Sequence, residues 1–110
     1  MRRSIESAQR KVRIISLSAN AAGTALSGID SLQATLTDTG TGDKLITLNE
    51  ALAAAPQVQV TVKTDESIAR VGTVTASTIQ ILTDDATDGT TAKDAAVDIL
   101  IIGKDVVDSY

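Results

Sequence analysis

The sequence lacks most of the side chains on which protein chemistry usually depends. It contains no His, Cys, Trp or Phe, and Tyr110 is its single aromatic residue. Without His there is no Ser-His-Asp or Cys-His nucleophile system and no imidazole metal site. Without Cys there is no disulfide bond, thiolate zinc site or iron–sulfur cluster. We therefore expect that the protein is not an enzyme and carries no cofactor.

The lack of aromatic residues and of phosphate-binding motifs also limits which partners the protein can bind. Proteins that bind single-stranded nucleic acid stack its bases on aromatic rings, and neither the G-x-x-x-x-G-K-[ST] nor the G-x-G-x-x-G phosphate motif occurs. No apolar run approaches the roughly 18–20 residues that a membrane helix needs, and residues 1–30 show no signal-peptide pattern. We expect neither a nucleic-acid partner nor a membrane partner.

What the sequence does contain is a series of short aliphatic segments. The chain has 110 residues, 43% of them hydrophobic, and this length fits one domain. Strict alternation over residues 57–63 predicts a strand with one buried face. The largely β-branched run 97–102, which stops at Gly103, predicts a central strand covered on both sides. Further strands are predicted at residues 11–18, 31–37, 44–48, 68–75 and 78–83.

Turn-forming residues separate these segments. Residues 38–43 predict a hairpin connection, and residues 84–89 predict a longer polar loop. Short helices are predicted at residues 49–55 and within residues 4–13. The pattern as a whole predicts an all-β protein, an antiparallel β-sandwich or jelly roll with about seven short strands in residues 14–110.

Charge is distributed unevenly along the chain. Residues 1–13 contain five basic side chains against Glu6 alone, a net charge of +4, whereas residues 14–110 contain five basic and thirteen acidic side chains, a net charge of −8. We interpret residues 1–13 as a basic N-terminal arm that binds an acidic surface of a neighbouring protein. A solvated terminus without a partner is the alternative. The candidate partner-binding residues are Arg2, Arg3, Arg10, Lys11 and Arg13.

One tripeptide matches an enzyme signature. Asp38-Thr39-Gly40 is the pattern of aspartic proteases, in which two such Asp residues share one proton. Residues 101–105 are similar to the apolar-apolar-Gly segment that supports this pair in dimeric retroviral-type proteases. The chain has no Gly-rich flap between these points, and the tripeptide is also typical of a turn. We favour the turn, and a dimeric protease that uses Asp38 is the enzyme alternative.

Four acidic residues lie close together in the sequence: Asp84, Asp85, Asp88 and Asp94. Clustered carboxylates attract hard cations such as calcium. The spacing does not match an EF-hand, because Ala86 occupies the third position and Ala95 the position of the bidentate Glu. We favour a solvated turn, with an irregular calcium site as the alternative.

The order of short motifs from Gly40 to Lys104 resembles small β-sandwich domains of tailed-phage virion proteins. The shared pattern is a Gly-Thr-Gly turn, an alternating strand, an apolar-small segment ending in Pro, Val- and Thr-rich strands, an Asp-Gly loop and a last strand ending in Gly. The corresponding residues are 40–42, 45–48, 53–56, 58–62, 71–75, 78–81, 88–89 and 94–103. Such domains usually place Tyr or Phe in several strands, where this chain has Leu or Val.

The resemblance implies a structural protein of the bacteriophage particle, made in the host cytoplasm and located in the virion. At this size it implies a capsid decoration (cement) protein at the head surface, which stabilises the head through contacts with the major capsid protein. It also implies a homo-oligomer, with a trimer as the expected form. A small core without large aromatic residues favours assembly independently, because association buries more apolar surface. The alternative is an adhesive module of the tail fibre, collar or baseplate.

Overall fold

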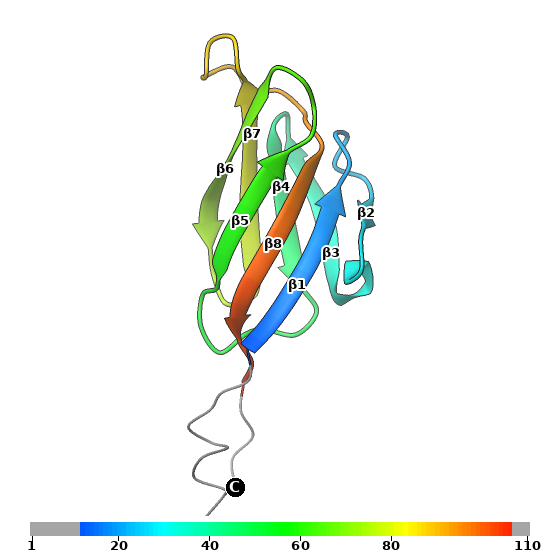
Figure 1. Ribbon diagram of the computed structural model, residues 1–110, viewed down its shortest axis with the longest axis vertical. Coiled ribbons are helices and arrows are strands. Elements are labelled where there is room, and N and C mark those ends of the chain that lie inside the picture. Colours follow the sequence, from blue (N-terminus) through cyan, green and yellow to red (C-terminus); the bar gives the residue numbers. More distant parts are fainter. Residues whose placement is uncertain (1–11, 107–110) are drawn as a thin grey trace, which may run out of the picture.

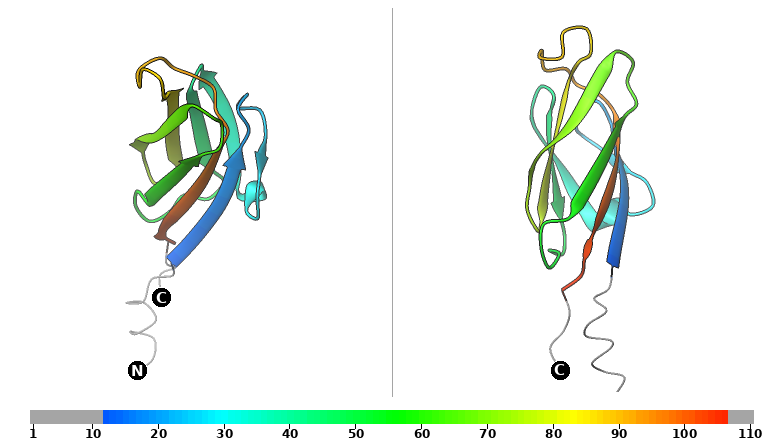
Figure 2. Two further views of the ribbon diagram at one scale, coloured as in Figure 1. Left: turned by 45° about the horizontal axis from the view of Figure 1, so that its top comes forward. Right: turned by 60° about the vertical axis from the view of Figure 1, so that its left-hand side comes forward.

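Two four-stranded antiparallel β-sheets pack face to face in residues 12–106, the part of the chain described by the structure, a computed structural model (Figure 1). One sheet has the strand order β2-β1-β8-β5 and the other β3-β4-β7-β6. Figure 2 shows the two layers from further sides. The elements are β1 (Val12–Ala19), β2 (Leu26–Ser27), the 3-10 turn η1 (Ser31–Gln33), β3 (Ala34–Gly40), β4 (Asp43–Leu48), β5 (Gln57–Val62), β6 (Ser67–Val74), β7 (Thr78–Asp85) and β8 (Val97–Lys104).

The core lies between the sheets and consists of alternating aliphatic positions. Along the central strands β1, β4, β7 and β8, alternate residues point inward and are buried, except near the start of β1 and the end of β8. Each Leu or Ile side chain that is fully buried contributes about 1.5–3 kcal/mol through the hydrophobic effect. The buried aliphatic residues of this cluster are Ile15, Leu17, Ala19, Ala34, Ile46, Leu48, Leu52, Ile79, Ile81, Val97, Ile99 and Ile101.

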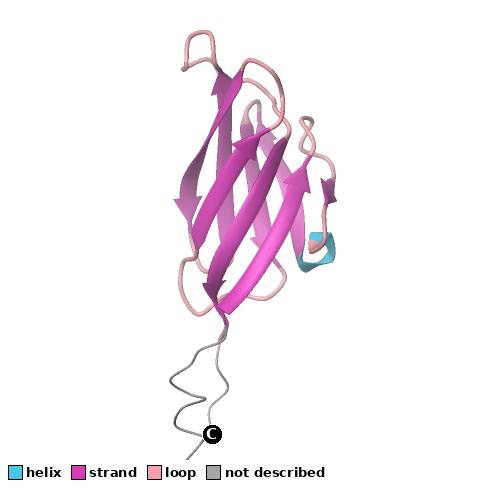
Figure 3. Ribbon diagram, in the orientation of Figure 1, coloured by secondary structure: helices cyan, strands magenta, loops and turns pink. Residues whose placement is uncertain are grey.

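The predicted all-β antiparallel sandwich is confirmed. The seven predicted strands correspond to β1 and to β3 through β8, and Figure 3 shows how strands dominate the described chain. The predicted connection at residues 38–43 is the β3–β4 hairpin, with an irregular register between Asp38 and Gly40. The eighth strand, β2, was not predicted, because two residues are too few to show a periodic pattern.

The strand predicted at residues 31–37 begins three residues late. Residues 31–33 form the 3-10 turn η1 instead, and Leu32, whose alternation with the following apolar residues suggested a strand, is 91% exposed. The chain turns here because the amide of Asp30 donates a hydrogen bond to the carbonyl of Ser16, and the amide of Gln33 donates to the carbonyl of Asp30. These bonds hold the segment against the edge of β1.

The helix predicted at residues 49–55 is wrong, since this segment is irregular. The amide of Leu52 donates to the carbonyl of Ala76, and the amide of Ala53 donates to the carbonyl of Lys104, each at 2.8 Å. The β6–β7 connection and the end of β8 thus accept hydrogen bonds from amides that a helix would have paired internally. Tertiary contacts have overridden the local helix propensity.

Strand β1 begins inside the segment interpreted as the basic arm. Val12 and Arg13 pair with Lys104 and Gly103 of β8. The helix predicted within residues 4–13 therefore does not include its last two residues. The remainder of that prediction lies outside the described residues.

The prediction that residues 97–102 are covered on both sides is correct for one side. Strand β8 is central, between β1 and β5, and its inner face packs on the other sheet. On the outer face, Asp98 is exposed, and Leu100 and Ile102 are only half-buried. The apolar run has one face in the core and a second apolar face toward the surface.

Candidate interaction surface

Arg13 lies at one end of the sandwich, which we call the terminal end: Val12, Arg13, residues 49–56 and residues 102–105. Here β1 begins beside the end of β8, with Val12 opposite Lys104, and the chain enters and leaves the sandwich (Figure 1). Of the predicted residues, the structure places Arg13 on β1. Arg2, Arg3, Arg10 and Lys11 lie outside the described residues.

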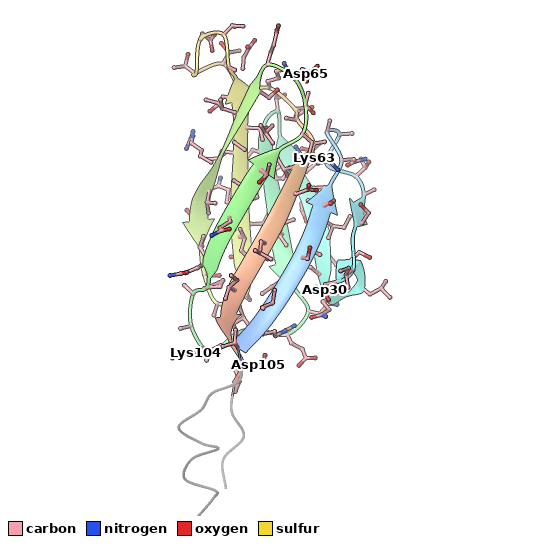
Figure 4. All side chains as sticks on the ribbon, in the orientation of Figure 1. Asp30, Lys63, Asp65, Lys104 and Asp105 are labelled. Atoms are coloured by element: carbon pink, nitrogen blue, oxygen red, sulfur yellow. The ribbon has the colours of Figure 1, made fainter. Side chains whose placement is uncertain are left out.

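The Arg13 side chain links several segments of the terminal end to one another. Its guanidinium donates hydrogen bonds to the Glu50 carbonyl and to Oε1 of Gln33, each at 3.1 Å. It also lies 3.5 Å from a carboxylate oxygen of Asp105, which Figure 4 labels at the end of β8. These contacts join β1 to the segment after β4, to η1 and to the end of β8. In the described structure Arg13 holds its own domain together.

The segment that connects β4 to β5 closes the terminal end with an apolar side chain. Leu52 is buried at 3% exposure and belongs to the core cluster. A Cβ added to Gly103 would lie 2.8 Å from Cδ1 of Leu52 and 3.0 Å from Cβ of Pro56. Residue 103 therefore has to be glycine for Leu52 and Pro56 to pack this closely against β8.

A shallow groove of about 610 Å³ lies outside this closure. One side is formed by the alanine-rich run that ends at Pro56, and the other by the first residue of β1 and the last residues of β8. Lys104 and Gln57 are the lining residues with polar side chains, and the other seven are valine, isoleucine, alanine, proline or glycine. Such a surface is suited to holding an apolar segment of a partner. The lining residues are Val12, Ala53, Ala54, Ala55, Pro56, Gln57, Ile102, Gly103 and Lys104.

Sequence analysis did not identify this groove. The sequence feature that could have indicated it is the run from Ala53 to Pro56, whose small side chains leave space above β8. The run was interpreted as a short helix because alanine favours helices. Only the packing of Leu52 beneath it shows that the run is one wall of a groove.

The Asp-Thr-Gly tripeptide forms the end of β3, directly before the turn of the β3–β4 hairpin at Thr41 and Gly42. Oδ1 of Asp38 accepts a hydrogen bond from the amide of Gly40 at 3.1 Å, and the Thr39 hydroxyl donates to the carbonyl of Asp43 at 3.0 Å. Asp38 is exposed. The described contacts of this carboxylate are those of a side chain that shapes its own turn.

Asp85, the last residue of β7, and Asp88, in the loop after it, also accept local hydrogen bonds. Asp85 accepts hydrogen bonds from the amide and hydroxyl of Thr87, and these lower its pKa. Asp88 accepts from the hydroxyl and amide of Thr91 and the amide of Thr90, which lower its pKa to about 2. Within residues 12–106, no three acidic groups are arranged to hold a metal ion.

On strand β1 and its neighbour β8, the outer face of the β2-β1-β8-β5 sheet is polar in the half away from the terminal end and mainly apolar in the other half. In the half away from the terminal end, the Ser18 hydroxyl donates to Asp98 at 2.5 Å and lowers its pKa, and Lys63 (labelled in Figure 4) lies 3.5 Å from the same carboxylate. In the half toward the terminal end, Val12 and Ile14 are 61% and 60% exposed. The exposed apolar surface therefore continues from the groove onto β1.

Comparisons with known proteins add no relative. A scan against family models, a search of curated proteins and a search of solved structures each found no match. Among the described residues, no helix is long and apolar enough to cross a membrane.

Proposed function

We propose that this protein is a structural component of a bacteriophage virion, a capsid decoration protein that stabilises the head by contacts with the major capsid protein. The observation that carries the proposal is the position of the apolar groove, at the end of the sandwich where β1 follows the basic residues 1–11. The groove receives an apolar segment of the partner. The basic residues contact an acidic surface beside it.

Binding, rather than catalysis, is supported by the chemistry of the described surface. Of the nine residues that line the groove, only Lys104 and Gln57 have polar side chains. The Asp38 carboxylate, on which a protease would depend, accepts a hydrogen bond within its own turn. These features favour a protein whose work is done by contact with its neighbours.

Co-sedimentation with phage heads that lack their decoration protein tests the proposal. We expect the full-length chain to bind such heads and raise the temperature at which they release DNA. Electron microscopy should place ordered copies on the head surface. Density confined to the tail would contradict the capsid proposal and support the adhesive tail module. Failure to bind any part of the particle would contradict both.

The role of the basic arm has its own test. Replacing Arg2, Arg3, Arg10 and Lys11 by Gln should weaken head binding at least about tenfold and reduce its salt dependence, because each charge pair contributes at an exposed surface. The control replaces Lys63 and Arg70, two basic residues on the sides of the sandwich, and should leave binding unchanged. Equal effects of the two sets would contradict the role of the arm.

A further inference from the structure

The outer edge of β1 is covered along only half of its length. Strand β2 pairs with Ser18 and Ala19. Next to it, Ser16 donates its amide hydrogen to Oδ2 of Asp30 at 2.8 Å and accepts a hydrogen bond from the amide of Asp30 at 3.3 Å. Figure 1 shows β2 beside the far half of β1 only, and Figure 4 labels Asp30 beside the strand. Toward the terminal end, nothing in residues 12–106 pairs with this edge.

The backbone groups of Val12 and Ile14 point toward the uncovered edge. In an antiparallel sheet, the N–H and C=O of one residue point to the same side, and the side alternates along the strand. Because Ser16 points away from β8, Ile14 and Val12 do so as well. Their amides and carbonyls form an unpaired edge, which is a template for a further strand.

The side chains on this edge are apolar, unlike those of the other sheet edges. Val12 and Ile14 are exposed on the outer face, and Ile14 lies opposite Ile102 of β8. Natural sheet edges are usually protected from pairing by polar or charged side chains. Strands β3 and β5 follow that rule, with exposed Thr35, Thr37 and Asp38 on β3 and Gln57, Gln59 and Thr61 on β5. Strand β6 has one exposed apolar side chain, Ile68 at 42%, but the exposed Arg70 lies beside it.

We propose that a second copy of this chain pairs antiparallel with the open half of β1, about a two-fold axis next to Arg13. Val12 of each copy then pairs with Ile14 of the other, which uses every outward backbone group of the described open edge. The β2-β1-β8-β5 sheet of one copy and the same sheet of the other copy then form one continuous sheet of eight strands. Val12, Ile14 and Ile102 of both copies form one apolar strip across the axis.

Charge complementarity supports a second copy of this chain as the partner of the open β1 edge. In the antiparallel register, the end of β1 at Val12 faces the part of the other copy's β1 that Asp30 borders. The sequence immediately before Val12 is basic, with Arg10 and Lys11. Asp30 is flanked by Ile29 and Leu32, which are both 91% exposed. The aliphatic stems of a lysine and an arginine cover such apolar surface while their charged groups reach a carboxylate.

The chain's own residues 1–11 are a poorer occupant of the same edge. To pair with β1 they would have to reverse direction just before Val12, and tight hairpin turns favour Gly, Asn or Asp because these residues tolerate positive φ. Residues 1–11 contain none of the three. A second copy reaches the edge without any reversal.

The oligomeric state of the full-length chain tests the inference, and the test needs no phage component, so its failure is separate from failure of the capsid proposal. We expect a concentration-dependent dimer in sedimentation velocity, rather than the trimer that the resemblance implied. Ile14→Lys should weaken association at least about tenfold, because it places a charge opposite Val12 within the apolar strip on each side of the axis. The control is Ile68→Lys, on β6 of the other sheet and 42% exposed, which should leave association unchanged.

Two results would overturn the inference. One is a monomer at all concentrations up to about 100 µM, since a specific interface of this kind should be measurable there. The other is association that Ile14→Lys and Ile68→Lys affect equally. Circular dichroism of each variant establishes that it is folded before its association is compared.

A cysteine test examines the register and does not depend on the lysine variants. The natural chain has no cysteine, so Val12→Cys and Ile14→Cys each carry a single thiol. Directly opposed residues have Cβ atoms about 4.5–5.5 Å apart, close to disulfide geometry. Under mild oxidation the mixture of the two variants should form disulfide-linked dimers at least about tenfold faster than either variant alone. Equal rates in the three samples would overturn the register.

Discussion

The two ends of the sandwich are closed by opposite kinds of contact. At the end away from the termini, which we call the polar end (Gly42, Lys44, Thr83 and residues 93–95), hydrogen bonds make the closure. The Thr83 hydroxyl donates to the carbonyl of Lys93 at 2.6 Å, and Lys44, at 2% exposure, donates from Nζ to the carbonyl of Ala95 at 3.1 Å. The amide of Gly42 donates to Oδ1 of Asp94 at 2.8 Å.

The terminal end is closed by aliphatic contact instead. Leu52 and Pro56 pack over Gly103, and a groove lined mainly by alanine and other apolar residues remains outside them. The polar end satisfies its polar groups within the chain, whereas the terminal end leaves apolar surface exposed. This difference indicates that the polar end serves the stability of the domain and that the terminal end is available to a partner.

The largest expected effect is at Gly42 of the polar end. Its φ of +66° is a left-handed conformation, and an added Cβ would lie 2.9 Å from the backbone nitrogen of Lys93 and even closer to the carbonyl of Thr83. Because backbone cannot move aside without breaking the hydrogen bonds of this end, Gly42→Ala should cost about 3–5 kcal/mol of unfolding free energy. Urea denaturation followed by circular dichroism measures the loss.

Gly89 provides the matched control. It has a similar φ of +72°, but an added Cβ would meet nothing within 4 Å. Gly89→Ala should therefore cost only the conformational strain, about 1–2 kcal/mol. Equal losses at the two glycines would show that close packing is not what fixes Gly42.

Leu52 tests the aliphatic closure of the terminal end. Its truncation to Ala leaves a cavity between the sheets and should cost about 3 kcal/mol. Ile68→Ala, which shortens an exposed side chain on β6, should stay within about 0.5 kcal/mol of the natural protein. Thermal or urea unfolding of both variants checks the contrast. A loss at Leu52 no larger than at Ile68 would mean that Leu52 does not close the core.

Gly103→Ala is expected to have a smaller effect than either Gly42→Ala or Leu52→Ala. The added methyl group meets the end of the Leu52 side chain and Pro56 rather than a hydrogen-bonded backbone. Leu52 can change its rotamer in response, so the cost should be about 1–2 kcal/mol.

A double-mutant cycle identifies the cause of that cost. If Leu52 is the obstacle, Gly103→Ala should cost clearly less in a chain that already carries Leu52→Ala, because the smaller side chain leaves room for the methyl group. Strictly additive losses would contradict the packing argument for residue 103.

The strands could be predicted because their pattern is local. In residues 57–62, alternation alone identifies the strand and its buried face. Lys44 shows the limit of this approach: it shares the inward face with Ile46 and Leu48, but a lysine carries no signal for burial. Its burial depends on the carbonyl of Ala95, more than fifty positions away.

The surface that we propose for binding could be predicted only in part. The charge asymmetry of residues 1–13 is visible in the sequence, but the groove arises from the hydrogen bond between Ala53 and Lys104 and from the packing of Leu52. The open edge of β1 likewise depends on how far along β1 the contacts of β2 and Asp30 extend. Such features come from tertiary pairing, which no local pattern encodes.

The smallest effect concerns the acidic loop beyond the polar end. The hydroxyl and amide of Thr91 and the amide of Thr90 lower the pKa of Asp88 from its ordinary value of 3.8 to about 2. A carboxyl group with a lowered pKa in the folded state stabilises that state above its ordinary pKa and loses this contribution as the pH falls toward 2.

The amide resonances of Thr90 and Thr91 should therefore shift together between pH 4 and 2. Asp88→Asn should remove this transition while residues lining the groove, which include no carboxylate, keep their resonances unchanged. A transition in the natural chain centred near pH 4 would show that these hydrogen bonds do not persist in solution. The acidic loop would then lack the internal hydrogen bonds that close the polar end.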